Sequence, residues 1–443
     1  MSRRSTAVRI TLALLGVVPG IVIALGSFDL DPYLRMVIFG LAIWCAATML
    51  GWAAETAEMD ITGALAMALL AIVAILPEYA VDVILAFNAG TDPSFEALAS
   101  ANMNGATRLL IGLALPLVVL AGLASKRRRR RRLSEGGANG SAADAAATSP
   151  PQTPAGAGHQ ASGADGPPPR PRPAMVRVLG STLEIPKAHY NTMFFLVIVA
   201  GMGALAPLTG QVSALLGAPL LVVFAVFLWH ASRGEVEEPE LVGVSAALGG
   251  LPKKRRRTVV ILFFLIAAAT IFVGAEPFVH SLIESGHALG INEALLIQWL
   301  APLASEAPEF IIALTLASRG KAPAAVGILL TSMVNQWSCL VGSLPFAFRL
   351  GGGSWSLPLD SRQVEEFLLT GSVTAVAVAL LLSRRIPAWG AYFMLAVFVA
   401  EFALPDEHAR LVLAAVNAVA AVALVIANAR YIRPLFKQPF LRE

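Results

Sequence analysis

A carboxylate and an amide recur at one fixed spacing in two stretches of this chain that are otherwise almost wholly apolar. Glu78 and Asn104 are 26 positions apart, and so are Glu309 and Asn335. Ionisable side chains are costly inside a bilayer and usually mark an ion or substrate path. Hard cations prefer oxygen ligands, which carboxylates and amides supply. The two pairs therefore predict a cation site near the midplane of a membrane transporter.

A proline immediately precedes each of these glutamates, at Pro77 and Pro308. Inside a helix, proline removes a hydrogen-bond donor and disturbs the preceding turn. Irregular backbone at membrane depth is tolerated only where it is buried or lines a cavity. We therefore expect the freed carbonyls near residues 73–74 and 303–304 to face a cation.

Two further carboxylates lie one turn from the predicted site. Asp82 follows Glu78 on the same helical face, and Glu306 precedes Glu309 by three residues. Both are candidates for a proton relay or a vestibule.

Arg108 lies one turn beyond Asn104, where a fixed positive charge would repel a cation. An unpaired guanidinium at this depth costs at least about 2.5–3.5 kcal/mol. We expect Arg108 to pair with Glu78 or Glu309 as an internal counter-ion. The alternative is that its side chain extends to the cytoplasmic interface.

The composition is that of a polytopic membrane protein. Of 443 residues, 56% are hydrophobic and 14% are charged, and the mean hydropathy is +0.70, whereas soluble domains carry roughly 25% charged residues. Cys45 and Cys339 lie in apolar runs without a CxxC or Cys/His cluster, so neither a disulfide framework nor a zinc site is indicated. The net charge of +4 is concentrated in loops and gives no sign of nucleic acid binding. We predict no cofactor, only transported cations.

Apolar runs long enough to cross a bilayer predict an all-α fold of about twelve helices. They cover about residues 8–26, 35–54, 62–87, 95–122, 190–208, 212–231, 258–283, 293–317, 322–346, 364–382, 387–404 and 409–428. The first run lacks a clear A-x-A cleavage site, so we interpret it as an uncleaved helix rather than a signal peptide.

The distribution of Lys and Arg predicts the orientation of these helices. With twelve helices, all the basic clusters fall on one face, at residues 3–4, 126–132, 253–257, 319–321, 384–385 and 430–442. The loops on the opposite face hold few basic residues. We expect a multi-pass protein of the plasma (inner) membrane with both termini in the cytoplasm.

Polar segments divide the chain into parts. We predict an extra N-terminal helix (1–34), a first half (35–125, its repeat at about 62–122), a linker (126–188), the last two helices of the first half (189–231), a cytoplasmic loop (232–257), a second half (258–404, its repeat at about 293–346) and an extra C-terminal helix with a tail (405–443). The linker is rich in Pro, Ala and Gly, which predicts disorder. Its basic run, Lys126–Arg132, is expected to lie on anionic lipid headgroups.

The two halves are expected to have inverted topology, because an odd number of helices separates equivalent elements. The Glu78 helix then runs outward and the Glu309 helix runs inward. Such inverted repeats permit alternating access around one site.

These features together resemble the alpha repeats of the sodium/calcium exchanger superfamily of cation antiporters. LPE at 76–78 and SEAPE at 305–309 are similar to the first element of the repeat. NMNGAT at 102–107 and SMVNQW at 332–337 match the second element more loosely.

The resemblance implies exchange of a metal cation, Ca²⁺ or Na⁺, against Na⁺ or H⁺ through Glu78 and Glu309. It also implies supporting oxygens from further residues, namely Asn104, Asn335, Ser305 and Ser332. The family's hydroxyls before the first Pro-Glu are replaced here by Ala74 and Ile75. Together with Arg108, these departures favour a lower cation count, or protons as the counter-substrate.

Other function classes remain open at this stage. A Na⁺ or K⁺/H⁺ exchanger of the same fold is one alternative, and a passive cation channel is a further one, although inverted, Pro-broken halves favour a carrier. An intramembrane protease needs a serine elbow or paired aspartates, and the chain contains neither GxSG nor GxGD. We therefore predict that the protein is not an enzyme.

Overall fold

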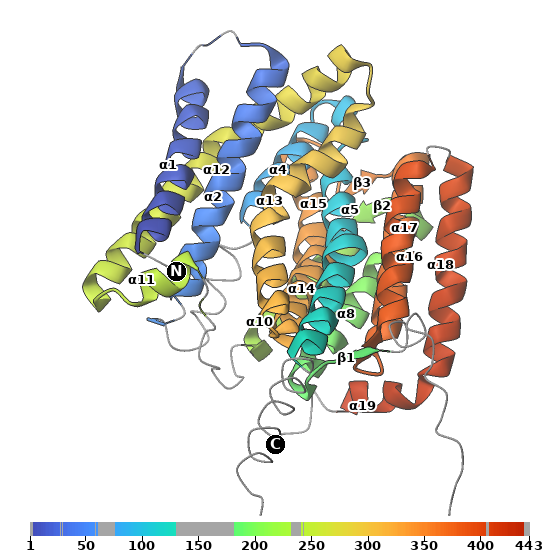
Figure 1. Cartoon of the computed structure of the whole chain (residues 1–443). Coiled ribbons are helices and arrows are strands. Elements are labelled where there is room, and N and C mark those ends of the chain that lie inside the picture. Colours follow the sequence, from blue (N-terminus) through green and yellow to red (C-terminus); the bar gives the residue numbers. More distant parts are fainter. Residues whose placement is uncertain are drawn as a thin grey trace, which may run out of the picture.

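The computed structural model describes residues 3–26, 28, 30–57, 59–60, 76–129, 181–231, 241, 243–404 and 407–437. These residues form a bundle of long helices that run roughly side by side (Figure 1). The predicted all-helical membrane fold is confirmed.

The helices and strands of the first half follow one another in chain order. They are α1 (Arg3–Leu25), α2 (Pro32–Ala57), α4 (Leu76–Ala89), the 3₁₀ turn η1 (Pro93–Phe95), α5 (Ala101–Arg108), the π-helical segment η2 (Leu109–Ala114), β1 (Thr182–Glu184), the 3₁₀ turn η3 (Lys187–His189), α8 (Tyr190–Gly203), α9 (Leu205–Thr209), β2 (Gln211–Ser213) and α10 (Ala214–Ala231). Helix α5 and η2 belong to one span that continues to Arg129.

The elements of the second half also follow one another in chain order. Its elements are α11 (Val244–Gly249), α12 (Lys253–Leu289), α13 (Glu293–Ser318), α14 (Ala322–Asn335), the π-helical segment η4 (Gln336–Leu340), α15 (Val341–Leu350), β3 (Ser356–Pro358), α16 (Ser361–Leu381), β4 (Arg385–Pro387), α17 (Ala388–Ala403), α18 (Glu407–Ala427), the 3₁₀ turn η5 (Ala429–Tyr431) and α19 (Ile432–Lys437).

Within the described residues, nine helices are long and apolar enough to cross a membrane, and bent α13 makes ten. The other two of the twelve predicted runs contain shorter helices. Helix α17 has 16 residues, and α4 has 14 residues that follow an undescribed segment. Helix α12 is longer than predicted, because its 37 residues include the basic run that we had placed in the preceding loop.

Ion pairs connect α2 to α12 near the start of α2 and just after its end. Arg35 pairs with Glu284 at one end, and Asp60 accepts hydrogen bonds from Arg256 Nε and Nη2 at 2.7 Å at the other. The pairing with Arg256 lowers the pKa of Asp60 below its ordinary value. The start of α12 is therefore held against the residues that follow α2, and the predicted cytoplasmic loop (232–257) was wrong for residues 253–257, which are helical.

Two short antiparallel ribbons join the halves at opposite ends of the bundle (Figure 1). Strand β1 pairs with β4, and β2 pairs with β3. The predicted boundary at residue 188 was wrong, because residues 181–188 are already ordered by this pairing. The predicted disorder of residues 130–180 lies outside the described residues.

The packing repeats in a manner expected of inverted halves. Helix α4 packs on the span Ala322–Leu350 as α13 packs on the span Ala101–Arg129, and α8 packs on α14 as α16 packs on α5. The two ribbons repeat in the same way, because each pairs a strand of one half with a strand of the other. A π-helical segment also follows the predicted asparagine of each half, after Asn104 and after Asn335.

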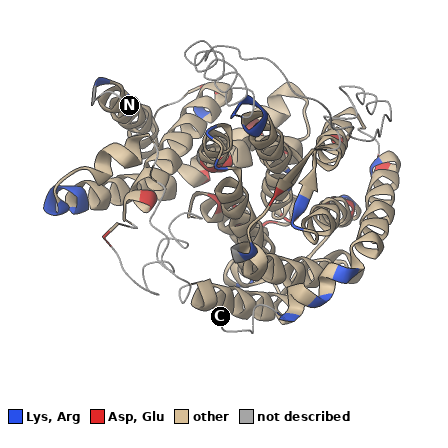
Figure 2. Cartoon of the chain, turned by 60° about the horizontal axis from the view of Figure 1, so that its bottom comes forward, with Lys and Arg blue, Asp and Glu red and all other residues tan. Residues whose placement is uncertain are grey.

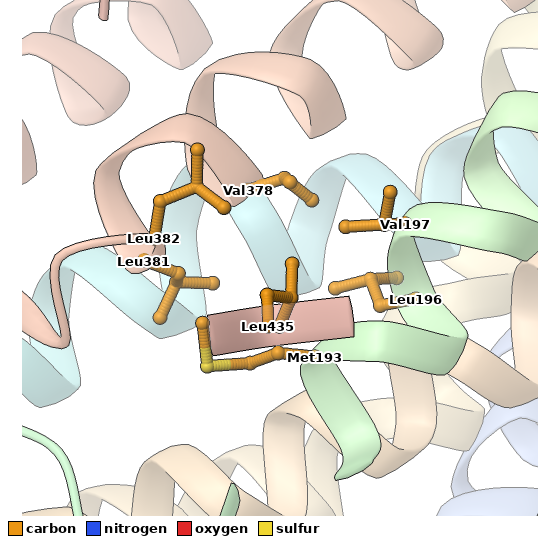
Figure 3. A pocket seen from close by; sticks show the side chains of 7 residues that line it. All are labelled: Met193, Leu196, Val197, Val378, Leu381, Leu382 and Leu435. Carbon is orange, nitrogen blue, oxygen red and sulfur yellow. The ribbon is translucent and has the colours of Figure 1, made fainter. Parts of the chain in front are cut away.

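The short C-terminal helix α19 lies at the lower end of the bundle in Figure 1. Its Leu435 is buried and faces a small apolar pocket between α8 and α16 (Figure 3). Helix α11 and the start of α12 lie at this same end. Figure 2 views the chain from this side, and Lys and Arg mark several of the helix ends.

Candidate functional site

Helix α13 brings two carboxylates to the middle of the bundle. It bends by 57° between its segments Glu293–Ala307 and Glu309–Ser318. The bend occurs where the sequence places proline, which has no N–H to donate to the carbonyl of Ala304. Glu306 and Glu309 therefore lie on either side of a weakened turn.

A buried amide joins the two halves at this point. Gln336 begins η4 and is fully buried. Its Nε2 donates to Glu78 Oε1 at 3.0 Å and to Glu306 Oε1 at 2.9 Å. Ser332, one turn earlier, donates its hydroxyl to Glu309 Oε2. We call these five residues the central cluster: Glu78, Glu306, Glu309, Ser332 and Gln336.

The central cluster is strongly acidic. Glu78 is 4% exposed and Glu306 is 7% exposed, and both interact electrostatically with Glu309. Among the described residues no Lys or Arg pairs with any of the three, and residues 61–75 contain no basic residue. Three negative charges cannot persist together in a low-dielectric interior without a compensating charge.

Several buried acceptors around the cluster have no hydrogen bond. They are Glu306 Oε2, Gln336 Oε1 and Asn335 Oδ1. An unsatisfied buried acceptor costs about 1–3 kcal/mol. Carboxylate and amide oxygens of this kind are the ligands that a hard cation requires, so the donor set fits a transported cation.

Asp82 lies one turn beyond Glu78 and is fully buried. Its nearest donors are the Asn102 side chain and the Met103 backbone N–H, but neither of its oxygens makes a hydrogen bond of normal geometry. Asp82 also interacts electrostatically with Glu78, so it extends the acidic region from the central cluster along α4.

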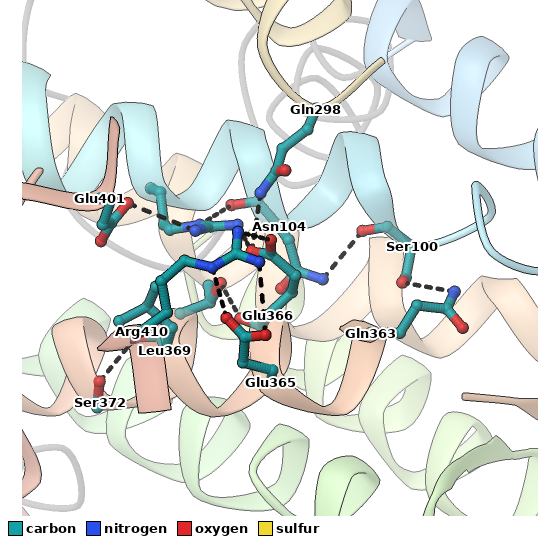
Figure 4. Close-up of polar contacts among 12 residues, drawn as sticks. Ser100, Asn104, Gln298, Gln363, Glu365, Glu366, Leu369, Ser372, Glu401 and Arg410 are labelled. Carbon is teal, nitrogen blue, oxygen red and sulfur yellow. Dashed lines mark hydrogen bonds and ion pairs between the residues drawn. The ribbon is translucent and has the colours of Figure 1, made fainter. Parts of the chain in front are cut away.

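Two of the predicted ligands have other partners in this conformation. Asn104 donates its Nδ2 to the Ser100 carbonyl at 3.1 Å, and Figure 4 places it beside a different polar network. Ser305 donates to the carbonyls of Ala301 and Pro302 in its own helix, both at 3.3 Å. Residues 73–74, whose carbonyls we expected at the site, lie outside the described residues.

Arg108 has carboxylate partners, as expected, but they are not the predicted ones. Its Nη2 pairs with Glu366 on α16, and its Nη1 lies 3.4 Å from Glu401 Oε2 on α17. The guanidinium is 2% exposed and lies over the Trp299 ring, 5.4 Å from its centroid. The predicted counter-ion role toward Glu78 or Glu309 was wrong, and so was the alternative that Arg108 reaches the cytoplasmic interface.

The partners of Arg108 belong to a longer series of ion pairs (Figure 4). Arg410 on α18 lies 2.7 Å from Glu365 Oε1 and 3.1 Å from Glu366 Oε1. Gln298 on α13 adds a hydrogen bond to Glu366 Oε2 at 2.9 Å. We call the alternating series Glu401–Arg108–Glu366–Arg410–Glu365 the ion-pair chain.

Sequence reasoning did not assign four of these residues, which are Gln336, Glu365, Glu366 and Glu401. A signal was present for each of them. Gln336 follows Asn335 in an apolar helix, and the three glutamates lie within predicted membrane helices, where ionisable residues are expected to have a role.

Comparison with known proteins agrees with the fold. A family model described as sodium/calcium exchanger protein matches residues 259–403. The crystal structure of the H⁺/Ca²⁺ exchanger CAX is 28% identical, with a TM-score of 0.81, over 98% of this chain and 97% of that chain. Residues 259–403 therefore match the sodium/calcium exchanger family, and the chain as a whole has the fold of the exchanger CAX. The predicted family is thereby confirmed, and with it the expectation of a transporter rather than an enzyme.

Two more distant solved structures also matched the chain. Native YfkE is 14% identical over 88% of this chain and 97% of that chain, with a TM-score of 0.58. The sodium-calcium exchanger NCX_Mj is 14% identical over 90% of this chain and 100% of that chain, with a TM-score of 0.47. No curated protein sequence matched this exchanger.

Proposed function

We propose that this exchanger carries Ca²⁺ in one direction and H⁺ in the other, with both ions bound in turn by the central cluster. The observation that supports this most directly is that Glu78, Glu306 and Glu309 meet without a basic partner from the part of the chain that the structure describes. A divalent cation neutralises two carboxylates, and its oxygen ligands are present. The similarity to an H⁺/Ca²⁺ exchanger favours this pair of ions over Na⁺.

The physical basis of exchange is mutual exclusion. When Ca²⁺ is absent, protons must neutralise the three carboxylates of the central cluster, because neighbouring negative charges repel strongly in a buried site. When Ca²⁺ binds, it displaces those protons. Because Arg108 is held by Glu366 and Glu401, no fixed positive charge competes for the cluster.

Each ligand in the proposal has a distinct role. Glu78 and Glu309 supply charge from the two halves, Glu306 supplies further charge beside the bend, and Gln336 holds two of the carboxylates together. Ser332 supports Glu309, and Asn335 contributes an acceptor that has no hydrogen bond. Asn104 and Ser305 use their backbone partners only as acceptors, through Nδ2 and the hydroxyl, and Asn104 Oδ1 has no hydrogen bond, so the oxygens of both side chains could still contribute.

The test uses purified protein in proteoliposomes, with one cation present at a time. Ca²⁺ uptake should follow an imposed pH gradient and be unaffected by a Na⁺ gradient. Uptake driven by Na⁺ alone would contradict the proton as counter-ion. Exchange of Na⁺ or K⁺ for H⁺ without Ca²⁺ flux would identify a monovalent cation/proton exchanger, and Ca²⁺ flux that neither saturates nor requires an opposing ion would identify a channel.

The proposed orientation has both termini in the cytoplasm of an inner-membrane protein. It is supported by the basic residues at the end of the bundle where α19 and the start of α12 lie. In this orientation Lys126–Arg132 would contact anionic lipid headgroups, at about 1 kcal/mol per basic residue near the surface. Residues 126–129 of that run continue the preceding helix, and the rest lies outside the described residues.

A further inference from the structure

The ion-pair chain lies outside the central cluster and contains one more carboxylate than guanidinium group. Three glutamates alternate with two arginines, and both ends of the series are carboxylates. Every member is largely buried, since the side chains of Arg108, Glu366, Glu401 and Glu365 are at most 7% exposed and that of Arg410 is 11% exposed. The series therefore carries a net charge of −1 when all of its groups are ionised.

The surplus negative charge faces a cavity rather than a packed core. The cavity has a volume of about 450 Å³ and is lined on one side by aromatic Trp299 and Phe402. Besides the ion-pair chain, the charged residues that line it are Arg362 on α16 and Glu407 on α18, whose charges cancel. The neighbouring α13 contributes only uncharged side chains to the lining, among them Gln298.

Glu401 is the member with the weakest compensation. Its single ion pair is 3.4 Å long and is made with Arg108, which is also bound to Glu366. At the other end, Glu365 is held by Nε of Arg410 at 2.7 Å. A buried carboxylate that is poorly paired is neutralised by a proton or a cation. The two arginines already share Glu366 and each pairs with one terminal carboxylate, so little room is left for the several oxygens that a metal ion needs.

We infer that this cavity is a second proton-binding site, in which Glu401 takes up one proton that is distinct from those exchanged at the central cluster. The proton forms an O–H bond on the Glu401 carboxylate, and the series becomes neutral, with two glutamates facing two arginines. The ion-pair chain joins α5 to α16, α17 and α18. Gln298 connects α13 to it through its hydrogen bond to Glu366. Protonation of Glu401 removes one of the two ion-pair partners of Arg108 and so weakens the contact between α5 and α17.

The test uses a variant in which the carboxyl groups of the central cluster have been replaced by amides. Glu78, Glu306 and Glu309 are changed to Gln and Asp82 to Asn, so that no carboxyl group of this acidic region contributes to the signal. Infrared difference spectra of the purified full-length protein are then recorded in steps of pH, and the carbonyl band of protonated carboxyl groups is measured. The background separates this inference from the proposed function, because Ca²⁺ transport is not required.

The expected result is a band equivalent to one carboxyl group, which Glu401→Gln removes. Glu365→Gln should remove it as well, since deleting either terminal carboxylate makes the series neutral. Glu184→Gln is the matched control and should leave the band unchanged, because Glu184 is exposed and does not line the cavity. A band that survives both Glu401→Gln and Glu365→Gln would overturn the inference. Loss of the band on adding Na⁺, K⁺ or Ca²⁺ at constant pH would also overturn it, because the cavity would then bind a metal ion.

Discussion

At the scale of single residues, the site depends on one amide that contacts two carboxylates from different helices. Gln336 donates to Glu78 and Glu306 through the same nitrogen. It thereby brings together one residue from each half of the chain. Glu306, which the sequence indicated only as a relay or vestibule candidate, lies beside Glu78 in the structure.

Glu306→Gln is expected to abolish Ca²⁺ uptake, as are Glu78→Gln and Glu309→Gln. Each change keeps the shape of the side chain and removes a charge that a hard cation needs. Initial rates of Ca²⁺ uptake into proteoliposomes should fall at least about tenfold, which corresponds to about 1.4 kcal/mol. The exposed Glu407→Gln is the control and should retain uptake. Near-normal rates in all three central variants would mean that the ion binds elsewhere.

The two site residues that the sequence indicated most directly share a simple property. Glu78 and Glu309 are carboxylates in long apolar runs, and the cost of placing a charge there signals a role whatever the fold. The partner of Arg108 could not be predicted in the same way. The sequence places Glu78 on the neighbouring helix, but Glu366 and Glu401 come from helices more than 250 positions later, and only the tertiary packing brings them to Arg108.

At the scale of elements, the contact between α5 and α13 holds the two repeats together. Pro302 cannot donate to the carbonyl of Gln298, which is four residues earlier, and this oxygen is therefore free of its usual helical bond. Gly105 of α5 packs directly on it. A Cβ atom at position 105 would lie 1.6 Å from that oxygen.

Gly105→Ala is therefore expected to push α5 away from α13. Overpacking of this kind costs typically about 1–3 kcal/mol and occasionally more. The melting temperature of the purified protein should fall, and Ca²⁺ uptake should fall with it. Gly201→Ala is the matched control, because an added Cβ there meets no atom within 4 Å. Equal melting temperatures for the two variants would show that the close approach does not matter.

The ion pair between Asp60 and Arg256 is a second element contact with a measurable effect. Asp60→Asn should destabilise the protein by about 1 kcal/mol at neutral pH, after allowance for solvent screening. The pKa of Asp60 is lowered by Arg256. Its stabilisation is therefore complete above the ordinary Asp pKa of about 3.9 and is lost as the pH falls through the lower, folded-state value.

Thermal unfolding of wild type and Asp60→Asn across a pH series measures this effect. The difference in melting temperature should be constant near neutral pH and should shrink only in acid. Asp92→Asn is the control, since Asp92 caps a surface turn through Ser94 and asparagine caps about equally well. A difference that stays constant down to the most acid pH would mean that the Asp60 charge contributes nothing.

At the scale of the whole molecule, the structure has the internal symmetry that the sequence spacing predicted. Equal offsets of 26 positions in two stretches indicated two related halves, and the helix packing and both ribbons repeat in the same inverted manner. The strands themselves were not predicted. Three-residue strands have too few positions for an alternating pattern to stand out from the neighbouring turns.

The proposed orientation predicts which end of the bundle faces the cytoplasm. Arg385 and Ser354 are both exposed and lie next to different ribbons. On a background of Cys45→Ser and Cys339→Ser, the variant Arg385→Cys should react with a membrane-impermeant maleimide only from the cytoplasmic side. Ser354→Cys should react only from the opposite side. The reverse pattern would invert the orientation, and labelling from both sides would contradict a single topology.

The central claim is that Ca²⁺ and protons compete for the same three buried carboxylates. The most direct measurement records Ca²⁺ entry and proton exit together, with two dyes in the same proteoliposomes. The account predicts that each Ca²⁺ that enters is matched by protons that leave, and that both movements stop in the Glu78→Gln, Glu306→Gln and Glu309→Gln variants. Ca²⁺ entry without proton exit, or coupled movement that persists when all three glutamates are replaced, would contradict it.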